Sequence, residues 1–160
     1  DFQFFQDVVV LSLSTRLHKF SQTSHVFTRP MELSDLPAVT NVDHESFEPI
    51  WTISSKGLEA AFLQSSHAAV AEIDGKIVGY EITTANDFSA HLARVAVAPN
   101  FQHAQIGFQL VNEMITHFIH NGITSITVNT QSNNTASINL YKKVGFTETG
   151  DRFPVFRSRA

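Results

Sequence analysis

The sequence contains no cysteine in its 160 residues. This absence excludes disulfide bonds, metal sites built on thiolates and catalysis by a cysteine nucleophile. A chain without cysteine is compatible with a reducing compartment, and we expect a cytoplasmic protein.

Basic side chains are too few to give the chain a positive field. Eleven Lys and Arg residues stand against fifteen Asp and Glu, for a formal net charge of -4. We therefore expect neither nucleic acid nor an anionic membrane as a partner. The one apolar run that resembles a targeting segment, "DVVVLSLS" at residues 7–14, is too short to span a bilayer and begins with an acidic residue.

Length and composition favour one folded domain. A chain of 160 residues, 42% of them hydrophobic and 16% charged, is ordinary for a protein with one core. The sharpest change in character falls in residues 21–30, so we divide the chain into an N-terminal extension, residues 1–24, and a domain, residues 25–160. The extension starts with Asp1 and not with methionine. Three roles stay open for it: an added edge strand, a dimer contact, or the tail of a lost upstream domain.

Alternating and helical patterns predict an α/β fold with a mixed central β-sheet and flanking helices. Ser34 is the expected N-cap of the first helix, Asp74-Gly75 forms a hairpin turn, and Asn121-Gly122 ends the third helix. Parallel connections are expected only in the second half of the chain. Strands are expected at residues 7–14, 25–29, 68–73, 76–84, 91–99, 123–130 and 153–157, and helices at residues 34–47, 55–66, 106–120 and 133–146.

The stretch "VAVAPNFQHAQIGFQL", residues 95–110, has the order of an anion-binding site. A β-branched strand ends at Pro99, a polar loop follows, and helical spacing begins near Ile106. The first turn of such a helix points free N–H groups at whatever lies in front of it, which suits a phosphate. Loops of this kind usually carry several glycines, whereas this one has only Gly107. A plain strand-to-helix connection is therefore the alternative.

Two blocks of this sequence resemble the Gcn5-related N-acetyltransferase (GNAT) superfamily, and most of all its ribosomal-protein and peptide N-acetyltransferases. The first block is Gln102-His103-Ala104-Gln105-Ile106-Gly107, which is similar to the acyl-CoA loop of that family. The second consists of Asn134, Tyr141 and the pair Gly145-Phe146, in register after a strand. The resemblance covers about residues 26–157 and implies the GNAT fold, with acetyl-CoA as co-substrate.

The loop departs from the family pattern at Gln105 and at His103, where glycine is common. A pyrophosphate needs mainly backbone N–H groups, which every residue except proline has, and glycine matters only where φ is positive or a Cβ would collide. We therefore expect the loop to bind. The resemblance implies that the cofactor contacts the main chain of the strand, the loop, the start of the helix after the loop, and side chains of the helix predicted at residues 133–146. The residues are Val95, Ala96, Val97, Gln102, His103, Ala104, Gln105, Ile106, Gly107, Phe108, Asn134 and Tyr141.

Acetyl transfer to an amine needs a neutral amine, a polarised thioester and a proton for the departing thiolate. By resemblance, Tyr141 is the acid, although a tyrosine that only packs is the alternative. His91 lies where peptide-acetylating relatives often have a glutamate, and a neutral imidazole can accept the proton. Glu81 is the second candidate base, and a water relay without a single base stays open.

The segment "HESFEPIW", residues 44–51, resembles the acceptor-side loop of the peptide N-acetyltransferases. Phe47 and Trp51 would form a wall for the substrate, and Glu45 or Glu48 would attract its ammonium group. Arg94, inside an apolar strand, would pair a substrate carboxylate or one of these glutamates. A helix end with aromatic core contacts is the alternative.

The leading hypothesis is an N-acetyltransferase that moves the acetyl group of acetyl-CoA to a primary amine, either a peptide N-terminus or a small molecule. The alternative is a non-catalytic acyl-CoA-binding or regulatory module with the same fold. No metal is expected, because His117 and His120 lie one helical turn apart without a third ligand. Both a monomer and a homodimer are compatible with the sequence.

Overall fold

The computed structural model describes residues 1–19, 26–102 and 105–158. The strands are β1 (Phe2–Ser14), β2 (Phe27–Pro30), β3 (His67–Ile73), β4 (Lys76–Ala85), β5 (Ser89–Val97), β6 (Ser125–Gln131) and β7 (Thr147–Ser158). The α-helices are α1 (Leu36–Ser46), α2 (Ser55–Leu63), α3 (Ile106–His120) and α4 (Thr135–Val144). Short 3-10 helices are η1 (Thr15–Leu17), η2 (Leu33–Asp35), η3 (Pro49–Trp51) and η4 (Pro99–Phe101).

In the described part of the chain, the strands form one seven-stranded sheet in the order β2-β3-β4-β5-β6-β1-β7. Neighbouring strands are antiparallel except β5 and β6, which are parallel and joined through α3. The predicted mixed sheet with flanking helices is confirmed, and so is its parallel connection in the second half of the chain. Asp74 and Gly75 have φ angles of 51° and 75°, the conformation that a tight hairpin between β3 and β4 requires.

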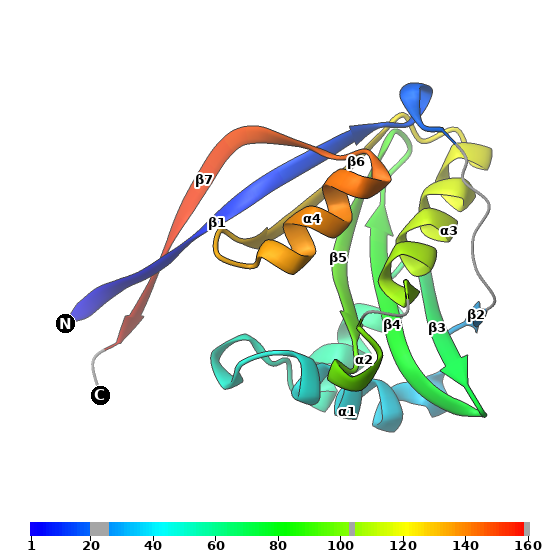
Figure 1. The fold of residues 1–160 in the computed structure, drawn as a ribbon, viewed down its shortest axis with the longest axis horizontal. Coiled ribbons are helices and arrows are strands. Elements are labelled where there is room, and N and C mark those ends of the chain that lie inside the picture. Colours follow the sequence, from blue (N-terminus) through cyan, green and yellow to red (C-terminus); the bar gives the residue numbers. More distant parts are fainter. Residues whose placement is uncertain (20–25, 103–104, 159–160) are drawn as a thin grey trace.

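The helices cover the two faces of the sheet. Helices α3 and α4 lie on one face, where Leu92, Met114 and Tyr141 are buried in a shared apolar cluster (Figure 1). Helices α1 and α2 cover β3, β4 and part of β5 on the opposite face, around Val39 and Leu58. No helix in the described ranges is long and apolar enough to cross a membrane.

Strands β5 and β6 separate halfway along their length. Their ladder joins only residues Ser89–Leu92 to residues Ser125–Val128, whereas β5 stays paired with β4 as far as Val97. The second half of β5 therefore has one open edge, directly before η4 and α3.

Strand β1 lies inside the sheet, between β6 and β7. Of the three roles left open for the N-terminal extension, an added edge strand does not apply, because β7 and not β1 lies at the edge. Val9, Leu11 and Leu13 are buried on the α3 and α4 face, so the alternating residues of β1 fit a strand with a partner on each side. Before Asp7, β1 pairs only with β7, and the two strands continue as a ribbon (Figure 1) whose last pair is Phe2 and Ser158.

The first predicted helix begins later than expected. Ser34 was the predicted N-cap, but residues 33–35 form η2 and α1 starts at Leu36. The cause is Asp35, whose carboxylate accepts hydrogen bonds from Arg29 at 2.8 and 2.9 Å and from the Glu32 N–H at 2.8 Å. These three hydrogen bonds to the Asp35 carboxylate stabilise the 3-10 turn η2 ahead of the helix.

Candidate functional site

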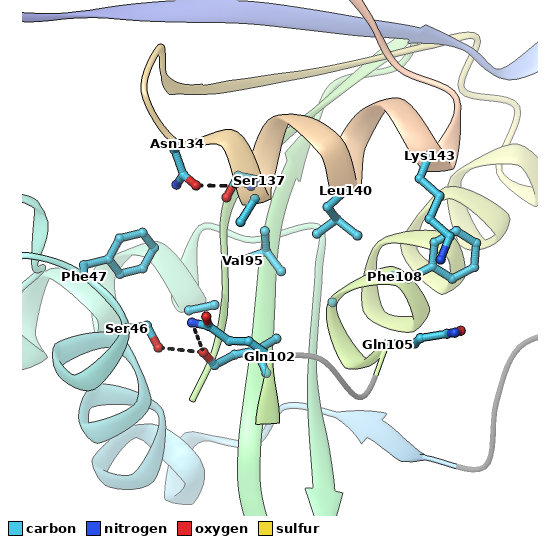
Figure 2. Close-up of a pocket in the computed structure, with 14 residues that line it drawn as sticks. Ser46, Phe47, Val95, Gln102, Gln105, Phe108, Asn134, Ser137, Leu140 and Lys143 are labelled. Carbon is cyan, nitrogen blue, oxygen red and sulfur yellow. Dashed lines mark hydrogen bonds between the residues drawn. The ribbon is translucent and has the colours of Figure 1, made fainter. Parts of the chain in front are cut away.

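A cavity of about 440 Å³ opens between the free edge of β5, the start of α3 and one side of α4 (Figure 2). Many of the residues that the sequence assigned to a cofactor meet here, although they come from three separate elements. The cavity is lined by Ser46, Phe47, Val95, Ala96, Val97, Gln102, Gln105, Gly107, Phe108, Asn134, Ala136, Ser137, Leu140 and Lys143.

The open edge of β5 presents backbone groups to the cavity. The Val97 carbonyl accepts hydrogen bonds from Ser46 Oγ at 3.0 Å and from Gln102 Nε2 at 3.1 Å, so it faces away from β4 (Figure 2). Residues two apart in a strand present their N–H and C=O to the same side. The backbone groups of Val95 consequently face the same gap, where an extended ligand can pair with them.

The first turn of α3 supplies further free donors. The first bond inside the helix runs from the Gln109 N–H to the Gln105 carbonyl, at 3.0 Å. The N–H groups of residues 106–108 precede that bond and have no acceptor in the helix. The Ile106 side chain is fully buried in the core, so only its backbone can serve a ligand. His103 and Ala104 lie outside the described residues.

Gln105 is in the left-handed conformation, with φ 58° and ψ 17°. This is the position where the family pattern has glycine, which adopts positive φ without a steric penalty. At Gly107, two residues later, glycine is needed for a different reason, which is steric. A Cβ there would lie 3.1 Å from Leu140 Cδ2, so glycine lets α3 approach α4 closely beside the cavity.

One side of α4 completes the cavity, and most of it was missed by the sequence analysis. Asn134 was predicted, and its Oδ1 also caps α4 by accepting from the Ser137 N–H at 3.1 Å. Ser137, Leu140 and Lys143 follow at helical spacing and line the cavity. That spacing, counted forward from Asn134, is the signal that could have found them. Lys143 Nζ lies 5.0 Å from the centre of the Phe108 ring, which places its ammonium group beside the start of α3.

Tyr141 lies on the same helix but packs inward. Its side chain is buried, with its ring 5.8 Å from that of Phe146, and it is not among the residues that line the cavity. Burial raises the pKa of the Tyr141 phenol, and the positive charge of Arg94 lowers it in part. The phenol is thus protonated at neutral pH and available as a donor.

His91 lies at the point where β5 and β6 begin to separate. Its Nδ1 is 2.8 Å from Thr127 Oγ1 on β6. Ala90 and Leu92, its neighbours in the strand, belong to the cluster beneath α3 and α4, so the alternation of the strand directs His91 to the opposite face. Burial lowers the pKa of His91 below 6.5. The imidazole is therefore neutral at pH 7.

Glu81 is fully buried and lies outside the cavity. Its carboxylate accepts hydrogen bonds from His67 on β3 and from Thr83 at 2.7 Å. Burial raises the pKa of Glu81, and the hydrogen bond with His67 lowers it. Because these partners hold the carboxylate toward β3, the structure does not bring Glu81 together with the other candidates.

Arg94 joins the sheet to the segment between α1 and α2. Its Nε donates to Asp43 at 2.7 Å, its Nη2 donates to the Trp51 carbonyl at 2.6 Å, and its guanidinium lies 3.8 Å from the centre of the Phe47 ring. Asp43 is fully buried and also accepts from the Tyr80 hydroxyl at 2.6 Å. Of the two partners expected for Arg94, neither glutamate is bound: its carboxylate partner is Asp43, which sequence reasoning missed. A substrate carboxylate as its partner stays a prediction.

The remaining acceptor candidates surround this network. Phe47 lines the cavity and Trp51 follows it in η3, so the structure brings Phe47, Trp51 and Arg94 together. Glu45 and Glu48 are exposed on the adjoining surface. Among the residues that the structure describes, no three His, Asp or Glu side chains gather as metal ligands would.

Comparison with known proteins identifies this arrangement. Residues 36–146, more than half of the chain, match the family described as Acetyltransferase (GNAT) family. The chain belongs to that family. The matched range includes the cavity and both blocks on which the GNAT resemblance was based.

Several proteins similar to this GNAT chain are named as acetyltransferases. It is 33% identical over 94 residues to the probable N-acetyltransferase camello of Xenopus tropicalis, covering 56% of this chain and 43% of that protein. It is 25% identical over 122 residues to the [ribosomal protein bS18]-alanine N-acetyltransferase of Escherichia coli, covering 74% of this chain and 78% of that protein. The structure of yncA, a putative acetyltransferase from Salmonella typhimurium with its cofactor acetyl-CoA, matches with a TM-score of 0.65 at 22% identity. The match covers 78% of this chain and 80% of that chain. This chain thus spans less than half of the camello protein.

Proposed function

We propose that this protein transfers the acetyl group of acetyl-CoA directly to a primary amine, with a peptide N-terminus as its first candidate acceptor. The observation that carries the proposal is the cavity that joins the open edge of β5 to the free N-terminus of α3. One relative acts on a ribosomal-protein alanine, and one similar structure contains acetyl-CoA, which supports both substrates.

The cavity suits coenzyme A in shape and in chemistry. The pantetheine arm is an extended amide chain, and the outward-facing backbone groups of Val95 can pair with it as a further strand would, whereas the Val97 carbonyl already accepts from Ser46 and Gln102. The pyrophosphate fits against the N–H groups of residues 106–108, where the helix dipole favours negative charge. Lys143 adds the ammonium group that faces this end of the cavity.

The two catalytic candidates lie on opposite faces of the sheet: His91 is near the end of the β5–β6 ladder, and Tyr141 is in the apolar cluster under α3 and α4. Bound acetyl-CoA supplies an activated acetyl group and a thiolate leaving group. We propose that His91 accepts the proton of the attacking amine, directly or through water, because its imidazole is neutral at pH 7. The Tyr141 phenol donates toward the departing sulfur. We no longer propose Glu81 as the base, since His67 and Thr83 hold its carboxylate away from the gap.

Phe47 and Trp51 form the acceptor wall in this proposal, and Glu45 attracts the ammonium group of the incoming substrate. Arg94 has a supporting role: its bonds to Asp43 and Trp51 fix the loop on which that wall stands. The substrate reaches the thioester from the face opposite α3 and α4.

The test is to incubate the protein with acetyl-CoA and a panel of peptides and small amines while free thiol is measured. Amine-dependent thiol release supports the transferase. Gly107→Pro, which removes one N–H donor and stiffens the helix start, should weaken coenzyme A binding in calorimetry. Unchanged affinity would place the cofactor elsewhere.

A non-catalytic acyl-CoA-binding module is the second candidate. The observation that favours it is Gln105, which adopts a left-handed conformation at the position where the family pattern has glycine. Tight binding of acetyl-CoA without thiol release for any amine in the panel would identify that module.

A further inference from the structure

The N-terminal strand reaches the acceptor side of the site through one residue. The Phe5 and Trp51 rings lie 6.1 Å apart at an angle of 36°. Phe5 also has the Arg157 guanidinium 5.0 Å from its ring centre. A strand from the start of the chain therefore touches the loop between α1 and α2, about 45 residues away in sequence.

A β-bulge directs Phe5 toward that loop. Phe4 is paired with Phe156 and Gln6 with Val155, so Phe5 is the extra residue on β1. Bulges of this kind re-aim a side chain and are frequent beside functional sites. Phe4, by contrast, packs within the ribbon, with its ring 6.0 Å from that of Phe156.

The contact extends a wall that begins at the cavity. Phe47 lines the cavity, Arg94 lies over the Phe47 ring and binds the Trp51 carbonyl, and Trp51 meets Phe5. Phe5 is only partly buried, so the aromatic surface that it forms with Trp51 is incomplete and can accept another apolar group.

We propose that Phe5 is a specificity-determining residue of the acceptor site, which selects amines whose neighbouring side chain is apolar. This inference rests on the proposed function, because it assumes that the acceptor amine enters beside Phe47 and Trp51. In a peptide substrate, the amine reaches toward the gap between β5 and β6 while the second side chain packs on the surface that Trp51 and Phe5 form together.

The kinetic test compares Phe5→Ala with Phe4→Ala, its neighbour on the same strand. Two peptides are used that differ only in the second residue, leucine or serine. For Phe5→Ala, we expect KM for the leucine peptide to rise on the order of tenfold, with KM for the serine peptide, KM for acetyl-CoA and kcat unchanged. Phe4→Ala should behave as the unaltered protein. Equal effects of the two variants, or none for Phe5→Ala, would overturn the proposal.

A second readout does not depend on catalysis. Trp51 is the only tryptophan in the chain, so its fluorescence reports on this wall directly. The leucine peptide should shift the Trp51 emission in the unaltered protein and in Phe4→Ala, but not in Phe5→Ala. A protein that releases no thiol yet shows this pattern would contradict the proposed function and retain the Phe5 site.

If Phe5→Ala does not fold, Phe5→Leu should fold and keep most of the affinity for the leucine peptide, and loss of that affinity in folded Phe5→Leu would count against the site.

Discussion

His91 Nδ1 lies 2.8 Å from Thr127 Oγ1, across the end of the ladder that joins β5 and β6. When Nδ1 carries the proton and donates to the hydroxyl oxygen, Nε2 keeps its lone pair and can accept a proton from an amine. In this tautomer, Thr127 holds the ring through Nδ1 and leaves Nε2 as the base.

The rate at saturating acetyl-CoA should rise with pH through an inflection below 6.5, because burial lowers the pKa of His91 and only the neutral imidazole is a base. His91→Ala should remove the inflection and slow the reaction, with coenzyme A binding nearly intact. His91→Glu should restore part of the activity and move the inflection to lower pH. A pH–rate profile that is the same in all three proteins would make His91 a structural residue.

Tyr141→Phe removes one hydroxyl group from a buried ring and keeps the ring packed on Phe146. We expect turnover to fall on the order of a hundredfold, the typical contribution of a general acid. Coenzyme A affinity and the thermal unfolding midpoint should change little, which calorimetry would verify. Full activity of the Tyr141→Phe variant would mean that Tyr141 only packs in the core.

Gln105→Gly should leave coenzyme A affinity unchanged or make it tighter, because glycine adopts positive φ without the roughly 1–2 kcal/mol penalty of other residues. Asp74→Gly is the matched control, since Asp74 also has positive φ, 51°, in the hairpin between β3 and β4. That variant should not alter coenzyme A affinity. A large loss of affinity in Gln105→Gly would show that the glutamine side chain itself binds the cofactor.

Lys143→Met should weaken coenzyme A binding and make it less sensitive to salt, because one cation beside the phosphates is lost. The neighbouring Lys142 provides the control. Its ammonium pairs with Glu148 at 3.1 Å on an exposed surface, so Lys142→Met should keep both affinity and salt dependence. Titrations at two salt concentrations would decide whether Lys143 faces the phosphates.

Arg94→Met should destabilise the fold by about 3–5 kcal/mol, because the buried carboxylate of Asp43 loses its cation. Arg152→Met removes an exposed partner of Asp7 at 3.8 Å and should cost about 1 kcal/mol or less. Urea unfolding of both variants measures the difference. The Ile53 N–H also donates to Asp43, at 3.1 Å. Equal stabilities would mean that this donor and the Tyr80 hydroxyl satisfy Asp43 without Arg94.

Local patterns in the sequence predicted the local structure well. Helix α3 begins and ends where its apolar spacing indicates, and Asp74-Gly75 forms the expected turn. The cavity was also largely predictable, because the strand, the loop and the helix start are contiguous in the chain. Side chains on α4 beyond Asn134 were missed only because the helical spacing was not followed from that residue.

Long-range partners were beyond sequence reasoning. Nothing in the local sequence of Arg94 indicates that it pairs with Asp43, 51 residues earlier. The alternation in β1 predicts a strand, but a strand pattern does not state which neighbours it pairs with. The same limit applies to Glu81, which was a candidate base because it lies on the strand before that of His91, and which His67 holds away from the gap.

The internal position of β1 has a consequence for how the molecule assembles. Its hydrogen bonds join residues 2–14 to residues 125–131 and 147–158, so β1 pairs with two strands that are synthesised more than 100 residues after it. Such pairing requires closure of very long loops, which slows folding. During translation, an apolar strand would wait unpaired while most of the chain is made, and it is in this interval that the chain is most prone to aggregation or to capture by a chaperone.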